Sequence, residues 1–344
     1  PIRPAEEAAA VVGSIIRCSL EDRERSRAGL SGEALSLEMN ACAVLVKVSL
    51  EDIDWQQGLR ITRRLTDIAP QFAAGHATHA IMAAMVGRQA EPGAEQKAGL
   101  LAEAKAEANR ALRLDGRAAN AWLARAVLAR ERSDFLETER LSQEAVKWAP
   151  DSPLTQSSYA GFLREVGRID AALDVLSSVN AARDARLGPT VDARAAILLA
   201  ASGDVDGALA EIGEFEAYRQ ADYQELRWLI AFWWGDPTAT LAALAAARRN
   251  GAAPPIEACY AQYLERLVAA AGRPIQGLPQ ACAAFPMDWR IRMLAREGDV
   301  DGAYDIWTSS PPSERRSPLI FYYPEMASFR RDPRFWPLLA RIGL

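Results

Sequence analysis

The sequence predicts an all-α protein, a right-handed α-solenoid of antiparallel helix pairs that ends in a C-terminal capping helix. Apolar residues recur at helical spacing, and no stretch alternates apolar and polar residues as a half-buried strand would. Residues 119–184 contain two helix-pair patterns that follow one another with a period of 34 residues. Because stacked units contact only their neighbours, a chain of 344 residues needs no second globular core.

The period is carried by small residues that recur where two helices must approach closely. Counting back from Pro150 as position 32 places Trp122 at position 4, Ala126 at 8 and Ala145 at 27. Counting back from Asp184 fills positions 7, 8, 11, 20 and 24 of the next copy with Tyr159, Ala160, Leu163, Ala172 and Leu176. This pattern resembles the tetratricopeptide repeat.

Upstream of this pair the same pattern continues with one insertion. Apolar spacing predicts a helix from Ala5, a second over 33–49, and a third that Asp52 or Asp54 caps and Pro70 closes. From Pro70 to Gly116 there are 116 − 70 = 46 residues, which is 34 plus an insertion of 12. The segment 88–99 contains proline and two glycines, and we expect it to be a loop at one edge of the array.

Downstream, a short phrase marks further turns between helices. GRIDAAL begins at Gly167, GDVDGAL at Gly203 and GDVDGAY at Gly298, with a looser copy at Gly235. The glycine allows the turn, and we expect Asp170, Asp206 and Asp301 to cap the helices that follow. Further helix pairs are predicted at about 189–219, 221–250, 255–284 and 287–310.

The last 27 residues differ in composition and define the predicted domain organisation. They concentrate aromatic side chains, and Asp332 followed by Pro333 predicts the start of a short helix. We therefore divide the chain into a repeat solenoid over 1–317 and an aromatic-rich cap over 318–344, packed on the same domain. A docking element for another molecule is the alternative interpretation of this tail.

Charge and hydropathy exclude some classes of function for this segment. The net charge is −5 and the isoelectric point about 5.4, so no broad basic surface is available for nucleic acid. Apolar runs such as 195–201 are far shorter than the roughly 20 residues that span a bilayer. The sequence starts with Pro1 rather than methionine, and we expect it to be a piece of a longer protein.

The repeats and the tail together resemble a known group of bacterial proteins. The likeness is carried by Pro70, Pro150, the GRIDAAL phrase and the closing string 323–344, which contains RDPRF and ends in IGL. The chain is similar to the C-terminal part of winged-helix transcription regulators of the CadC/ToxR-like type. Similar tails also end modules of adenylate-cyclase-like proteins and stand-alone repeat proteins.

The resemblance implies a non-enzymatic module that binds a protein or peptide and regulates transcription from the periplasm. A cytoplasmic location, an independent scaffold or chaperone adaptor, and a regulatory module of a cyclase-type enzyme are the alternatives. Membrane attachment would come only through a segment upstream of Pro1. The tetratricopeptide rule assigns the ligand groove to positions 2, 5, 9 and 12, which are Asn120, Leu123, Val127, Arg130, Leu154, Ser157, Gly161 and Arg164. Arg130 and Arg164 would form a bidentate clamp for a carboxylate, or else pair with neighbouring acids.

The four cysteines form two pairs in sequence. Cys18 and Cys42 lie equally far from the expected turn near residues 29–30, so they should come level across a helix pair. Cys259 and Cys282 are less symmetric about their turn. A disulfide between Cys18 and Cys42, which indicates an oxidising compartment, and four small buried thiols are the two interpretations.

Catalytic and metal motifs were sought among the remaining residues. His76 and His79 are three residues apart on one helix, but at repeat positions that pack between helices, so we predict no metal site and no cofactor. The sequence contains no nucleophile elbow, zinc-protease motif or phosphate-binding loop, and we expect no enzyme. The cluster Trp228, Phe232, Trp233 and Trp234 is interpreted as core rather than as a ligand platform.

Overall fold

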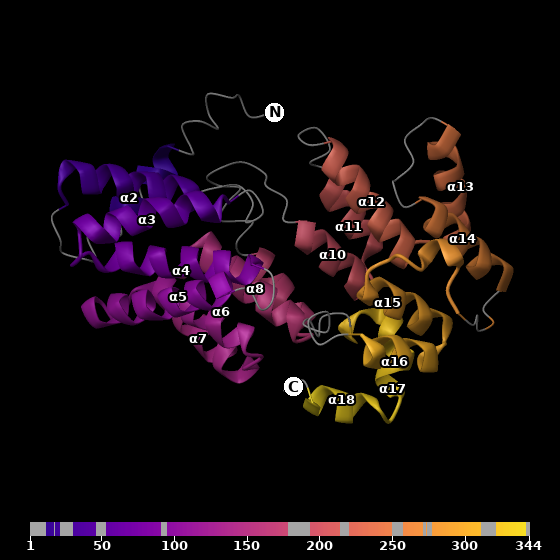
Figure 1. The fold of residues 1–344 in the computed structure, drawn as a ribbon. Coiled ribbons are helices and arrows are strands. Elements are labelled where there is room, and N and C mark those ends of the chain that lie inside the picture. Colours follow the sequence, from indigo (N-terminus) through magenta and orange to yellow (C-terminus); the bar gives the residue numbers. More distant parts are fainter. Residues whose placement is uncertain are drawn as a thin grey trace. The chain divides into compact units, whose positions relative to one another are not determined.

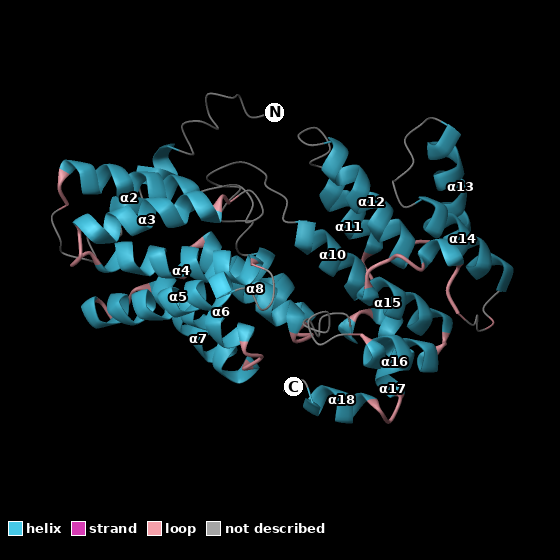
Figure 2. Cartoon of the chain, viewed as in Figure 1, coloured by secondary structure: helices cyan, strands magenta, loops and turns pink. Residues whose placement is uncertain are grey.

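The computed structural model describes residues 12–16, 18–20, 30–45, 53–90, 95–177, 193–213, 220–249, 257–270, 273, 277–310 and 321–341. Throughout these ranges the regular structure is helical, without a strand (Figure 2). The prediction of an all-α protein is therefore confirmed. The calls on residues 1–11, on the middle of the insertion and on 311–320 lie outside the described residues.

The chain divides into two compact units. The first unit consists of Pro1–Phe162, Asp174–Thr190 and Gly343–Leu344, and the second of Leu163–Leu173 and Val191–Ile342. Each unit is described by itself below.

The first unit is organised around the helix α4. Its helices are α2 (Gly32–Leu45), α3 (Trp55–Ile68), α4 (Ala73–Gln89), α5 (Glu95–Leu114), α6 (Ala119–Glu131), α7 (Phe135–Trp148) and the greater part of α8 (Pro153–Glu165) (Figure 1). Consecutive helices from α2 to α7 pack against one another, and α4 also contacts α6. Of the 17 residues of α4, 13 are buried, because neighbouring helices cover it on several sides.

Three helix junctions of this unit repeat the same hydrogen bonds. The backbone N–H groups of Phe72, Ala118 and Ser152 each donate to the carbonyl three residues earlier. At each junction a side chain at the start of the following helix also donates to the backbone carbonyl of the residue six positions earlier. These bonds run from His76 Nε2 to Pro70 O (3.1 Å), Trp122 Nε1 to Gly116 O (2.9 Å) and Gln156 Nε2 to Pro150 O (2.7 Å).

The spacings of these junctions are those of the predicted register. From Pro70 to Gly116 there are 116 − 70 = 46 residues, and from Gly116 to Pro150 there are 150 − 116 = 34. Three chemically different side chains make the same contact at position 4 of the repeat. The register inferred from small residues therefore has an independent basis in hydrogen bonding.

The insertion is wrongly predicted as a loop over its described residues. Arg88 and Gln89 complete α4, and 95–99 form the first turns of α5. Glutamate, glutamine, lysine and alanine favour helix, which outweighs the single glycine there. Lys97 Nζ lies 2.8 Å from Glu131 Oε2, so an ion pair attaches this extension to α6.

The turns inside the helix pairs share one backbone conformation. After α6, α8, α10 (Ala193–Ser202) and α15 (Met287–Glu297), one residue has a positive φ and the next N–H donates to the carbonyl five residues earlier. Glycine occupies the positive-φ position at Gly167, Gly203 and Gly298, as the repeated phrase predicts. In the first unit the same position is Ser133, with φ of 58°.

The capping residues differ from the prediction by two positions. Asp204 and Asp299 cap α11 (Val205–Gly213) and α16 (Val300–Ser309), whereas Asp206 and Asp301 lie inside the first turns of these helices. The tight turn places the residue after glycine at the N-cap, so the valine is already helical. At Gly167 that residue is Arg168, and Asp170 is helical. Asp54 and Asp134 likewise cap α3 and α7, because the carboxylate of each accepts a hydrogen bond from the backbone N–H three residues later.

We expect Ser133→Gly to stabilise the protein. A non-glycine residue in the left-handed region costs about 1–2 kcal/mol. Glycine loses about 0.5–1 kcal/mol of this gain through its greater freedom in the unfolded chain. Urea unfolding should therefore show a gain of roughly 0.5–1 kcal/mol. Ser133→Ala is the matched control and should give no gain, and equal effects of the two variants would contradict the argument.

The second unit contains a further set of helices. They are α10, α11, α12 (Gln220–Trp234), α13 (Pro237–Arg249), α14 (Glu257–Ala270), η2 (Gln280–Cys282), α15, α16, η4 (Pro324–Met326), α17 (Ala327–Arg331) and α18 (Phe335–Arg341). Three of the four predicted helix pairs are present as helices at these positions. In the predicted pair at 255–284 the described part of the second half is only the short 3-10 helix η2, so that pair is not two full helices.

The aromatic tail packs on the last two long helices of the second unit. The helix α17 contacts both α15 and α16. Phe329 stacks on Tyr304 with ring centroids 4.0 Å apart, and Phe321 lies 4.8 Å from Trp307. Tyr322 lies against the turn at Gly167, where a Cβ atom would overlap its ring. Among the aromatic side chains of the described tail, only Trp336 is mainly exposed, at 71%.

A buried arginine attaches the tail to α12 and α15. The guanidinium carbon of Arg292 lies 3.7 Å from the ring centroid of Trp233 and 4.1 Å from that of Tyr323. Arg292 Nε donates to Glu325 Oε1 at 2.6 Å, and Trp234 Nε1 donates to the other carboxylate oxygen at 3.2 Å. Both charged side chains are nearly inaccessible, at 7% and 3%. The pair is therefore a desolvated contact at the centre of the cap.

Removing Arg292 should strongly destabilise the second unit, because Glu325 would remain as an unpaired buried charge. For Arg292→Ala we expect a loss of about 3–5 kcal/mol in the free energy of unfolding. Arg331→Ala, on the exposed part of α17, is the control and should change it by less than about 0.5 kcal/mol. Millimolar guanidinium ion should restore part of the melting temperature of Arg292→Ala. A loss no larger than in the control would refute a structural role for this contact.

Candidate functional site

The residues assigned to a ligand groove are largely buried within their units. Leu123 and Val127 on α6 are 2% and 7% exposed, and Ser157 on α8 is 3% exposed. Asn120 is half-buried, and its Nδ2 donates to Thr78 Oγ1 on α4 at 3.4 Å. These four side chains therefore use most of their surface for packing. Their role in a groove stays a prediction.

The two arginines of the predicted clamp are half-buried. Arg130 belongs to the first unit and Arg164 to the second, and both have interaction partners. The alternative, pairing with neighbouring acids, also stays a prediction. A joint clamp stays a prediction.

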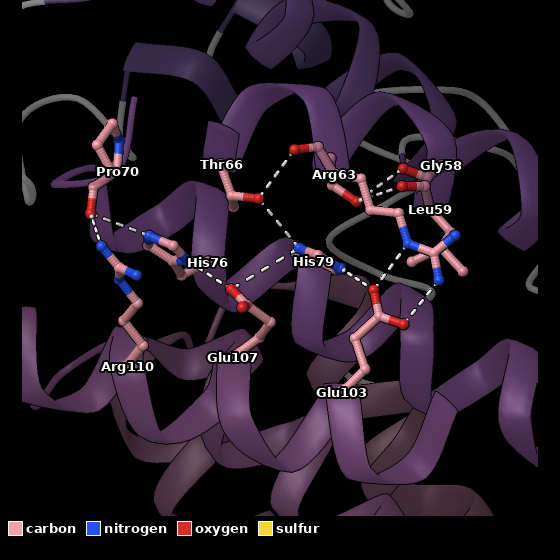
Figure 3. A network of polar contacts seen from close by, with 11 residues as sticks. Gly58, Leu59, Arg63, Thr66, Pro70, His76, His79, Glu103, Glu107 and Arg110 are labelled. Carbon is pink, nitrogen blue, oxygen red and sulfur yellow. Dashed lines mark hydrogen bonds and ion pairs between the residues drawn. The ribbon is translucent and has the colours of Figure 1, made fainter. Parts of the chain in front are cut away.

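The most polar buried cluster of the first unit lies along α4. His76, Thr78 and His79 are 2%, 3% and 5% exposed, on a helix whose other buried residues are apolar or glycine. Burying polar groups is costly unless each finds a hydrogen-bond partner. His79 reaches both α3 and α5, and His76 reaches α5 (Figure 3). Asn120 on α6 donates to Thr78, so each of these neighbouring helices is bonded to α4 through its own polar contact.

His76 has acceptors on both sides of its ring. Its Nδ1 lies 2.5 Å from Glu107 Oε2, and its Nε2 lies 3.1 Å from the carbonyl oxygen of Pro70. Arg110 donates to the same carbonyl at 2.9 Å. The ring of His76 therefore connects the carboxyl group of Glu107 on α5 to the junction between α3 and α4.

His79 bridges α3 and α5. Its Nε2 donates to Glu103 Oε1 at 2.8 Å, and its Nδ1 lies 3.2 Å from Thr66 Oγ1. Arg63 on α3 donates to both oxygens of Glu103, at 2.7 and 2.6 Å. Figure 3 shows this chain of contacts running from Arg63 through Glu103 to His79.

The glutamates of this network have lowered pKa values. The hydrogen bond from Arg63 lowers the pKa of Glu103, with a further contribution from His79, and outweighs the effect of burial. Burial raises the pKa of Glu107, but the hydrogen bond from His76 and the positive charges of His79, His76 and Arg110 together lower it below its usual value. Both carboxyls therefore stay ionised near neutral pH.

The donors of the network do not converge on one point. The two nitrogens of His79 face opposite sides of its ring, so Glu103 and Glu107 lie on either side of it (Figure 3). Among the described residues, no group of three or more histidine, cysteine, aspartate or glutamate side chains is arranged to hold a metal ion. What the arrangement does is supply hydrogen-bond partners to the two buried histidines from partly exposed glutamates.

Sequence reasoning found the two histidines and missed their partners. The acids come from α5, 24 residues after His79 and 31 residues after His76. The i, i+4 spacing of Glu103 and Glu107 places both on one helix face, which was the available signal.

All four cysteines are joined in disulfides. Cys18 is bonded to Cys42 and Cys259 to Cys282, with Cα atoms 5.9 and 4.9 Å apart. The level placement of the first pair agrees with the prediction from turn symmetry, and the second pair is bonded as well. Cys282 belongs to the aromatic core that contains Phe232 and Trp233, so the core interpretation of that cluster holds for these two rings.

Comparison with known proteins gives no family assignment. No protein-family model matches the chain, and no curated protein sequence matches it. In the part of the chain that the structure describes, no helix combines the length and the apolar character needed to cross a bilayer.

Acid should weaken the first unit through Glu103 and Glu107. A carboxyl with a lowered folded-state pKa contributes stability above its unfolded pKa, near 4.3, and loses it as the pH falls through the folded value. Urea unfolding at pH 5, 4 and 3 should show a steeper loss for the wild type than for Glu103→Gln/Glu107→Gln. Glu95→Gln, exposed on the same helix, should keep the wild-type slope. If the free energy of unfolding falls with pH equally in all three proteins, Glu103 and Glu107 make no such contribution.

Proposed function

We propose that the protein is a non-enzymatic helical-repeat module that binds a protein or peptide. Its fold would be a right-handed solenoid of antiparallel helix pairs of the tetratricopeptide type. The observation that carries this proposal is the repeated junction, in which His76, Trp122 and Gln156 make the same contact at spacings of 46 and 34 residues. Independent globular folds have no reason to repeat a side-chain contact in register.

The use of polar groups supports a binding role over a catalytic one. His76 and His79 are committed to Glu107 and Glu103, whose charges are neutralised inside the unit. A general base or a nucleophile needs reach to a substrate, which a buried, saturated pair lacks. We therefore propose neither enzymatic activity nor a cofactor.

The disulfides support a location in an oxidising compartment. Two of them in a chain with four cysteines agree with a periplasmic module, since cytosolic thiols are kept reduced. Together with the resemblance of the tail, this favours the sensory or regulatory part of a winged-helix transcription regulator. Packing of the aromatic tail on α15 and α16 favours a cap over a docking element for that segment.

The ligand class that we propose is a peptide with a free carboxylate. Arg130 in the first unit and Arg164 in the second each lie at position 12 of a predicted repeat, and each guanidinium group can bind a carboxylate bidentately. Each arginine already has a partner in the protein, so a ligand would have to compete with that contact.

A peptide screen tests this proposal. Libraries with free and with amidated C-termini are compared for binding to the wild type, to Arg130→Ala and to Arg164→Ala. We expect preference for free carboxylates and a loss of at least about tenfold in each variant, roughly 1.4 kcal/mol. Arg113→Ala, exposed on α5, should bind like the wild type. If neither library binds, the proposal of a peptide ligand is wrong. If the wild type and all variants bind equally, only the proposed role of the two arginines is wrong.

A further inference from the structure

We propose that Cys18–Cys42 is an exchangeable disulfide, opened by dithiol reductants that attack Cys18, with Glu38 exchanging a proton with Cys42. The bond joins the helical residues 18–20 to α2 in the first unit. This inference does not depend on the ligand groove. It assigns a redox reaction, and the class of molecule that performs it, to the first helix pair.

The two disulfides differ in accessibility. Cys259 and Cys282 are 2% and 0% exposed, in a core with Tyr260, Tyr263 and Phe232. Cys42 is equally buried at 2%, but its partner Cys18 is only half-buried. Thiol–disulfide exchange requires a thiolate to reach one sulfur of the bond. Solvent access therefore selects Cys18 as the attacked sulfur, and Cys42 as the sulfur that leaves.

A buried carboxyl lies beside the leaving sulfur. Glu38 is 1% exposed and precedes Cys42 by one helical turn, with its Oε1 3.7 Å from Cys42 Sγ. The other buried residues of α2 are alanine, valine and Cys42 itself, so Glu38 is the one ionisable group on the buried face of that helix. Glu38 also has a further interaction partner within the protein, and its position one turn before Cys42 places its carboxyl group beside that sulfur as well.

Proton transfer follows from the proximity of the two groups. A thiolate released at Cys42 would face the Glu38 carboxylate across 3.7 Å, and two negative charges on a buried face repel strongly. Release is favourable when the carboxyl of Glu38 gives its proton to the departing sulfur. Cys42 then leaves as a neutral thiol, and Glu38 remains as a carboxylate.

The complete exchange uses a dithiol as the reductant. Its thiolate bonds to Cys18 Sγ while the Cys18–Cys42 bond breaks, and that electron pair and the Glu38 proton form the Cys42 thiol. The second thiol of the reductant loses its proton to solvent, bonds to the first sulfur and releases Cys18, which takes a proton from solvent. Two electrons pass from the dithiol, which becomes a disulfide. In the reverse exchange, with the disulfide form of the dithiol as the electron acceptor, the Glu38 carboxylate accepts the proton of Cys42.

Native-state reduction tests the assignment. The folded protein is treated with dithiothreitol, alkylated at intervals and analysed by mass spectrometry for both disulfides. We expect Cys18–Cys42 to open at least about tenfold faster than Cys259–Cys282, and Glu38→Gln to slow its opening by about 10- to 100-fold. Glu33→Gln, exposed on the same helix, is the matched control and should keep the wild-type rate. The rate of Cys259–Cys282 should not change in either variant.

Single-cysteine trapping identifies the attacked sulfur. With glutathione disulfide as the probe, the lone Cys18 of Cys42→Ser should be modified faster than the lone Cys42 of Cys18→Ser. Equal rates for the two disulfides, faster modification of Cys42, or an unchanged rate in a folded Glu38→Gln would overturn the proposal. If circular dichroism shows that Glu38→Gln is unfolded, the wild-type rates and the trapping experiment decide between the outcomes.

Discussion

Two polar contacts between the histidines of α4 and the glutamates of α5 are the constraint on which the first unit depends. α4 is buried along most of its length, and apolar packing alone would allow it to rotate or slide between its neighbours. His76 and His79 remove that freedom, because each must reach its own glutamate. A rotated or shifted helix would leave buried polar groups without hydrogen-bond partners. The network therefore fixes the register of α3, α4 and α5 together.

The second unit uses the same principle with a different chemistry. Arg292 is held between Trp233 and Tyr323 and is neutralised by Glu325, which comes from the tail. The faces of the two rings attract the guanidinium group and cover it, so the cation is stabilised away from water. The tail is thus attached by one buried charge pair as well as by stacked rings, which distinguishes it from a simple apolar cover.

The repeated junctions show how a degenerate repeat keeps its geometry. His76, Trp122 and Gln156 share no chemical class, yet each has an N–H group that reaches the carbonyl six residues earlier. The requirement is for a donor of sufficient length, not for a particular residue. In the same way Ser133 adopts the conformation that glycine adopts at the related turns, at a cost in free energy.

The sequence by itself determined the all-helical class, the register from Pro70 to Pro150 and most turns, because these depend on local spacing and on glycine. It also placed Cys18 level with Cys42. Tertiary structure alone decided that Glu103 and Glu107 pair with α4, that Glu38 lies beside a disulfide, and that Leu123 and Val127 are buried. Charge pairing and burial depend on which distant helices meet, and no local pattern contains that information.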